Sequence, residues 1–65
     1  MYIIKRTRTY KDGTRLSAYY VRTTPLAIEM GSRGEARRYH TRPHARDVAR
    51  RIGMGSGVVY EIERV

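Results

Sequence analysis

Residues 41–53, TRPHARDVARRIG, have the pattern of one short amphipathic helix, and this pattern limits what the rest of the chain can form. Thr41 is a suitable N-cap, and Pro43 falls in the first turn, where its missing N–H costs no hydrogen bond. Because a single helix must pack its apolar stripe on another layer, the remaining segments have to supply a sheet. The stripe lies at spacings of three and four and consists of Ala45, Val48, Ala49 and Ile52.

The end of this helix is predicted at Gly53, which suits the left-handed C′ position, with Met54 folding back on the last turn. The glycine-rich stretch 53–57, GMGSG, resembles a phosphate-binding loop in composition only. A phosphate loop leads into a helix N-terminus, whereas this stretch follows a helix and precedes a strand. Its expected role is to cap the helix and turn the chain.

Residues 2–10 and 15–22 are rich in β-branched and aromatic side chains and predict two strands. The tetrapeptide KDGT, 11–14, lies between them, and its Asp-Gly pair is a strong hairpin signal because glycine accepts a positive φ. Both strands have apolar residues at odd and at even positions. The side of the hairpin that faces the core is therefore ambiguous from the sequence.

A short third strand is expected within residues 23–35, with Pro25 at its start and Leu26, Ile28 and Met30 on one side. Residues 31–34, GSRG, are expected to form a flexible loop. The connector 35–40 is compatible with one helical turn or with an edge strand.

Residues 58–65, VVYEIERV, predict the last strand. Val58, Tyr60 and Ile62 would point to one side, and Glu61 and Glu63 to the other.

Together these segments predict a single small basic α+β domain over residues 1–65. Its order is β-β-(β)-α-β, a mainly antiparallel sheet of three to four strands with one helix packed across one face. A chain of 65 residues has a thin core. The expected core residues are Ile4, Tyr20, Ala45, Val48, Ala49, Ile52, Val58, Tyr60 and Ile62.

The charge balance is strongly basic, with 14 Lys and Arg against 6 Asp and Glu and a net charge of +8. A positive field of this kind favours nucleic acid, anionic lipid or an acidic protein surface as the partner. The chain has no cysteine, which fits a reducing cytoplasm and excludes disulfides. No signal peptide or membrane-spanning run is recognisable, so a cytoplasmic protein without a membrane partner is expected.

Two basic elements predict the contact surface. Arg42, Arg46 and Arg50 follow one another at a spacing of four along one flank of the helix, where they either contact phosphates or form only the solvated side of a packed helix. The hairpin interleaves arginines with tyrosines, which can stack bases unless they fill the core. The predicted nucleic-acid-binding residues are Arg6, Arg8, Tyr10, Arg15, Tyr19, Arg42, Arg46 and Arg50.

Catalysis and metal binding are not indicated by the residues. His40 and His44 are four apart, but the predicted helix start lies between them and no convincing third ligand accompanies them. The serines, histidines and carboxylates show no nucleophile–base arrangement, and a domain this thin has little room for a closed pocket. Neither an enzymatic activity, a metal site nor a cofactor is therefore expected.

The second half of the chain resembles a class of very small phage-encoded proteins of unknown function. The resemblance rests on residues 35–39 (EARRY), on a Thr-Arg-x-x-Ala helix that ends at a glycine, and on a Tyr-Glu-Ile strand. It implies a hairpin, a helix and a C-terminal strand, and a viral or prophage source, but no activity. A Thr-Arg-x-x-Ala helix also recurs in SPOR-like peptidoglycan-binding domains, from which this chain departs because it lacks their paired first β-α unit. The matched residues in the helix and strand are Thr41, Arg42, Ala45, Ala49, Gly53, Tyr60, Glu61 and Ile62.

Three functions are compatible with this pattern. The first is an accessory protein that binds nucleic acid through its Arg and Tyr surfaces. The second is an effector that binds and inhibits a host protein, in which case the same arginines would meet carboxylates. The third is a structural homo-oligomer, such as a dimer formed through an edge strand.

Overall fold

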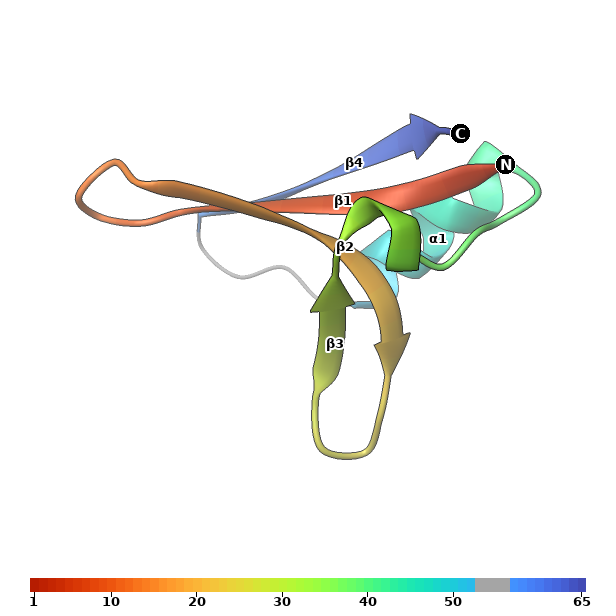
Figure 1. The fold of residues 1–65 in the computed structure, drawn as a ribbon, viewed down its shortest axis with the longest axis horizontal. Helices are drawn as coiled ribbons and strands as arrows, with labels where there is room; N and C mark the ends of the chain where they lie inside the picture. Colours follow the sequence, from red (N-terminus) through yellow and green to blue (C-terminus); the bar gives the residue numbers. More distant parts are fainter. Residues whose placement is uncertain (53–56) are drawn as a thin grey trace.

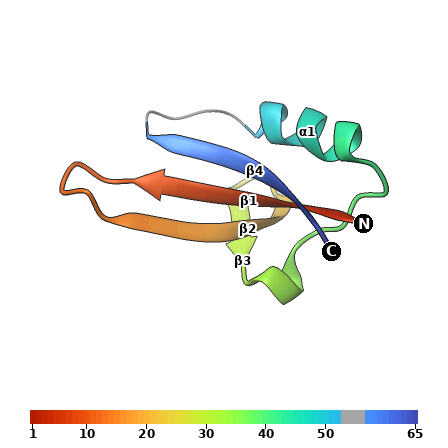
Figure 2. The ribbon, with the colours of Figure 1, turned by 90° about the horizontal axis from the view of Figure 1, so that it is seen from above.

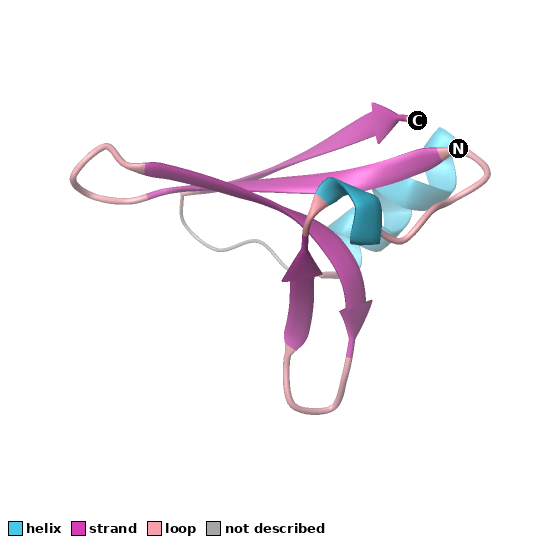
Figure 3. Ribbon diagram, viewed as in Figure 1, coloured by secondary structure: helices cyan, strands magenta, loops and turns pink. Residues whose placement is uncertain are grey.

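Four antiparallel strands form one sheet, and one α-helix packs on one face of it (Figures 1 and 3). The computed structural model describes residues 1–52 and 57–65. The strand order in the sheet is β3-β2-β1-β4, so β1 and β2 are central and β4 lies at an edge. This arrangement confirms the α+β prediction. The elements are β1 (Tyr2–Thr9), β2 (Arg15–Thr23), β3 (Ile28–Gly31), the 3-10 helix η1 (Arg33–Glu35), α1 (Arg42–Arg51) and β4 (Val58–Arg64).

The β1–β2 hairpin closes as its Asp-Gly pair predicts. Gly13 has a φ of +89°, a conformation that costs glycine little and other residues more. The turn is fixed by a hydrogen bond from the Tyr10 N–H to the Thr14 carbonyl (2.8 Å) and by one from the Thr14 N–H to Asp12 Oδ1 (2.9 Å). These contacts set the register in which Thr9 opposes Arg15.

The register resolves which side of the hairpin faces the helix. Ile4 is fully buried and shares a cluster with Tyr20 and the helix residue Ala45. Because neighbouring residues of a strand point to opposite faces, Ile3 lies on the other side of the sheet, where it is also buried. Apolar residues occur at both odd and even positions because, near the start of β1, side chains on both faces of the sheet are buried.

Helix α1 begins as its sequence predicts. The Thr41 hydroxyl accepts a hydrogen bond from the His44 N–H (3.3 Å), and a proline occupies the first turn. Ala45 and Ala49 are buried against the sheet, whereas Val48 and Ile52 are half-buried at the margin of the same cluster. The predicted cap at Gly53 and Met54 lies outside the described residues. Figure 2 shows α1 over the half of the sheet near the termini, with the β1–β2 hairpin extending past the end of the helix.

The third strand forms within the predicted segment, as β3 (Ile28–Gly31), but it begins later than predicted. Strand β2 continues to Thr23, and residues 24–27 form a tight turn in which the Ala27 N–H donates to the Thr24 hydroxyl (3.1 Å). Pro25 therefore lies in a turn and not at a strand start, and Leu26 is 96% exposed at the tip. The alternation of Leu26, Ile28 and Met30 placed the strand start too early. The turn is closed by the Thr24 side chain, so an apolar residue can occupy its tip.

Residues 31–40 are held by contacts within the segment and by backbone hydrogen bonds to β1 and β2. The predicted flexible loop is instead η1, which Glu35 caps by accepting hydrogen bonds from the Ser32 N–H (3.1 Å) and hydroxyl (2.9 Å). In the connector, Tyr39 forms an isolated bridge with Tyr2, and neither a helical turn nor a strand extends over residues 36–40. Tyr39 forms two backbone hydrogen bonds with Tyr2, both 2.8 Å, where β2 no longer pairs with β1.

The Glu35 cap predicts a small pH effect on stability. Hydrogen bonds from the backbone N–H and then from the hydroxyl of Ser32 lower the pKa of Glu35 below its usual 4.5. A lowered pKa adds stability above the unfolded-state value, and this stability is lost as the pH falls through the folded-state value. Glu35→Gln should therefore be less stable than wild type near neutral pH, and the difference should disappear in acid. Urea unfolding at both pH values measures it, and a difference independent of pH would contradict it.

The core contains fewer residues of the last strand and more residues of the connector than predicted. Tyr60 and Ile62 are half-buried at its margin, together with Val48 and Ile52. Val58 is half-buried but lies outside the core cluster. Three buried residues were not among the expected core residues. Ile3 was missed because the inward face of its strand was ambiguous, and Ala36 and Tyr39 because they lie in a connector with no assigned element.

Candidate nucleic-acid interface

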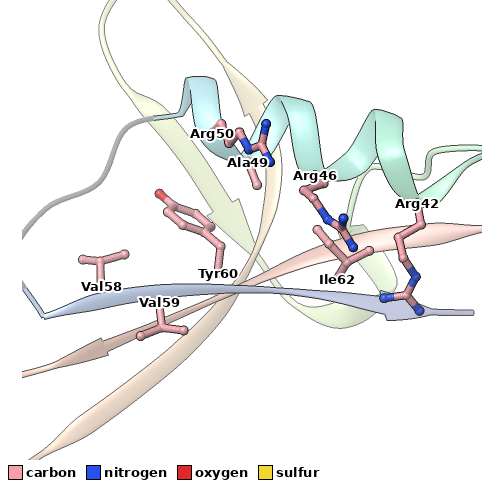
Figure 4. Close-up of a pocket in the computed structure, with 8 residues that line it drawn as sticks. All are labelled: Arg42, Arg46, Ala49, Arg50, Val58, Val59, Tyr60 and Ile62. Carbon is pink, nitrogen blue, oxygen red and sulfur yellow. The ribbon is translucent and has the colours of Figure 1, made fainter.

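One flank of α1 carries a row of exposed arginines. Arg42, Arg46 and Arg50 are each four residues apart, so they lie along the same side of the helix. Figure 4 shows all three projecting from α1 on the side of β4. The Arg42 guanidinium lies 5.2 Å from the centroid of the Tyr2 ring, a cation–π distance that orients the first member of the row.

A groove separates this row from β4. Its volume is about 470 Å³, and it is partly open to solvent. Val58, Tyr60 and Ile62 alternate with outward residues along β4, and Figure 4 shows Tyr60 pointing toward the helix. The groove therefore has one cationic wall and an apolar floor that contains an aromatic ring.

Two further arginines lie on the same face of the sheet. Arg6 is directly opposite Tyr60, and Arg8 is directly opposite Val58, so all four side chains share the face on which α1 packs. A second hollow of about 320 Å³ borders Arg6, Arg8 and Tyr10. We call the five arginines together the cationic face: Arg6, Arg8, Arg42, Arg46 and Arg50.

Carboxylates are held elsewhere in the structure. Glu29 pairs with Arg22 at 2.8 Å, and Asp47 pairs with Arg51 at 2.9 Å on the other side of α1. Within residues 1–52 and 57–65, no carboxylate lies within 4.0 Å of an arginine of the cationic face. The five guanidiniums are thus available to an external anion.

The opposite face of the sheet is mixed in charge. Glu63 accepts a hydrogen bond from the Tyr19 hydroxyl (2.9 Å) and lies 3.5 Å from the Arg33 Nε and 3.9 Å from the Lys5 Nζ. Glu61 is directly opposite Lys5 on this face. The two faces therefore differ in charge: carboxylates accompany the cations on this face, and none pairs with an arginine of the cationic face among the described residues.

The predicted site residues do not all come together. The helix row, Arg6, Arg8 and the exposed Tyr10 lie on the face where α1 packs or at its end. Arg15 and Tyr19 lie on the other face, because they oppose Thr9 and Lys5 in the hairpin register. The hydrogen bond to Glu63 further restrains Tyr19. The interleaving of arginine and tyrosine in the sequence did not reveal this division, since it depends on strand parity.

Tyr60 is the site residue that sequence analysis assigned only to the core. It is half-buried and borders both the core cluster and the groove. Its position opposite Arg6 on the neighbouring strand is fixed by the β1–β4 register. Its place in the sequence, as an aromatic residue in a strand that follows a basic helix, was the signal that could have indicated a role in binding.

Other chemistry has little support in the geometry. The ring of His44 packs edge-on against Tyr39 at 4.9 Å, and burial raises the pKa of the Tyr39 hydroxyl. Among the residues that the structure describes, no group of three potential ligand side chains could hold a metal ion. In the same part of the chain, no helix has the length and apolar character needed to cross a membrane.

No family model matches the chain, and no curated protein or solved structure is detectably similar to it. The groove and the distribution of charge are therefore the basis for a functional assignment.

Proposed function

We propose that this chain is a small non-enzymatic accessory protein, of the phage-encoded kind that its second half resembles, and that it binds nucleic acid through the cationic face. One observation carries the proposal: five arginines share one face without a carboxylate partner within 4.0 Å among the described residues, while Glu29, Asp47 and Glu63 are paired elsewhere. Unpaired guanidiniums suit phosphate oxygens, which they can bind through two parallel hydrogen bonds.

The scaffold supports such contacts because the arginines stand on regular elements. Arg42, Arg46 and Arg50 are anchored by a helix whose buried alanines fix it on the sheet. Arg6 and Arg8 are anchored by a central strand. Side chains held on rigid elements lose less entropy on binding than side chains on loops.

Removing the helix row tests the proposal. We consider the triple variant Arg42→Gln, Arg46→Gln, Arg50→Gln. It should bind nucleic acid about 100-fold more weakly near 0.1 M salt, because binding with fewer phosphate contacts releases fewer counterions from the nucleic acid. The slope of log K against log salt should fall by about 0.7–0.9 for each arginine removed. Fluorescence anisotropy of a labelled oligonucleotide across a salt series measures both quantities.

A matched control removes the same charge from other surfaces. Arg22, Arg33 and Arg51 each pair with a carboxylate, and their replacement by glutamine should change affinity and slope much less. Equal losses in the two triple variants would show that only net charge matters and would contradict a defined binding face. Equally tight binding of polyglutamate would instead favour an acidic protein partner.

A further inference from the structure

We infer that the groove between α1 and β4 binds a single strand of nucleic acid, with phosphates on the arginine row and a base against the apolar floor. This inference rests on the proposed function and adds the form of the nucleic acid that is recognised. It depends on two features of the groove that a phosphate-binding surface alone does not need, namely the spacing of its cationic wall and the chemistry of its floor.

The spacing of the wall matches one strand. Residues four apart in an α-helix are separated by about 6 Å along its axis, so the three arginines form a line about 12 Å long. An extended strand with unstacked bases places successive phosphates at a comparable separation. The row is single, because the other polar side of α1 carries the Asp47–Arg51 pair, and so it presents cations to one backbone.

The floor favours exposed bases. Val58, Tyr60 and Ile62 lie opposite the arginines across the groove, with Tyr60 directed toward the helix (Figure 4). In a duplex the base faces are stacked on one another and cannot reach such a floor. In a single strand they are free to pack on apolar and aromatic side chains, and a volume of about 470 Å³ lies in the size range of small-molecule pockets.

Comparison of three ligands of matched length tests this inference on the wild-type protein: oligodeoxythymidine, the same backbone without bases, and a duplex. Oligodeoxythymidine should bind at least about tenfold more tightly than the abasic backbone, since base stacking on a side chain adds that much. It should also bind more tightly than the duplex at the same salt concentration. Anisotropy competition against one labelled oligomer gives all three affinities.

A pair of variants locates the base contact. Val58→Asn should reduce the preference for bases over the abasic backbone by about fivefold or more, because it makes the floor polar. Val65→Asn is the matched control. Val65 follows β4, is 41% exposed and does not line the groove, so its replacement should leave the preference unchanged. Circular dichroism of both variants verifies that they fold alike.

The outcomes separate the two proposals. Salt-sensitive binding of all three ligands with equal affinity, or tighter binding of the duplex, would overturn the single-strand inference and leave the proposed function intact. Failure to bind any of the three would overturn both. Equal losses of base preference in Val58→Asn and Val65→Asn would also overturn the inference, because the contact would then not lie in the groove.

Discussion

Replacing Ile4 with alanine should destabilise the protein by about 4 kcal/mol, within the range for removal of a large aliphatic side chain from a core. Ile4 is fully buried at the centre of the cluster where Tyr20, Ala45 and Ala49 meet. The cavity cannot be filled easily, since the buried helix residues at the contact, Ala45 and Ala49, are both small. A domain of this length has a total stability of about 3–10 kcal/mol, so the variant should be largely unfolded at moderate temperature.

Urea unfolding followed by circular dichroism measures this loss. Leu16→Ala is the control, because Leu16 lies on β2 but is 58% exposed, and its truncation should cost less than about 1 kcal/mol. A midpoint for Ile4→Ala close to that of Leu16→Ala would show that α1 does not depend on this residue for its attachment to the sheet.

Gly57→Ala should cost about 3 kcal/mol for two reasons that add. Gly57 has a φ of +76°, where an alanine is strained, and a Cβ at this position would lie 2.7 Å from the Thr9 carbonyl oxygen. The Thr9 N–H donates to the Gly57 carbonyl at 2.8 Å, so this contact ties the start of β4 to the end of β1. The clash is with backbone, and relief would require the strands to separate.

Substitutions at two other glycines separate the two contributions to this destabilisation, backbone strain and the clash with Thr9. Gly13 has a φ of +89° but no atom near its Cβ position, so Gly13→Ala should lose only the conformational part, about 1 kcal/mol. Gly34 has neither a positive φ nor a close atom, so Gly34→Ala should be neutral or slightly stabilising. Thermal unfolding of the three variants should rank them with Gly57→Ala lowest. Equal midpoints for Gly13→Ala and Gly57→Ala would exclude the contact with Thr9.

The elements could be predicted where a local rule determines them. The Asp-Gly turn, the Thr41 cap and the alternation in β4 each follow from chemistry within a few residues, and the structure confirms all three. The connector could not be predicted in this way. Tyr39 is buried and pairs with Tyr2, a partner 37 positions earlier in the chain, and no local pattern specifies that contact.

The candidate site shows the same division. Local spacing predicts the helix row, and the structure places its members together on one flank. The sequence could not show on which face of the sheet each hairpin arginine lies. Apolar residues occur at both odd and even positions of the two strands, so either face could have been the buried one. The β1–β2 and β1–β4 registers place Arg6 and Arg8 with the helix row and Arg15 with the opposite face.

The sequence by itself determined the strongly basic charge, the single amphipathic helix and the turn that pairs the first two strands, because each depends on neighbouring residues or on composition alone. Only the tertiary structure decided which arginines share a face, where the carboxylates are paired, and that a groove with an apolar floor runs beside α1. Such features depend on strand register and on the position of α1 over part of the sheet. Both are set by the packing of residues far apart in the chain, as in the contact of Ile4 with Ala45 and Ala49.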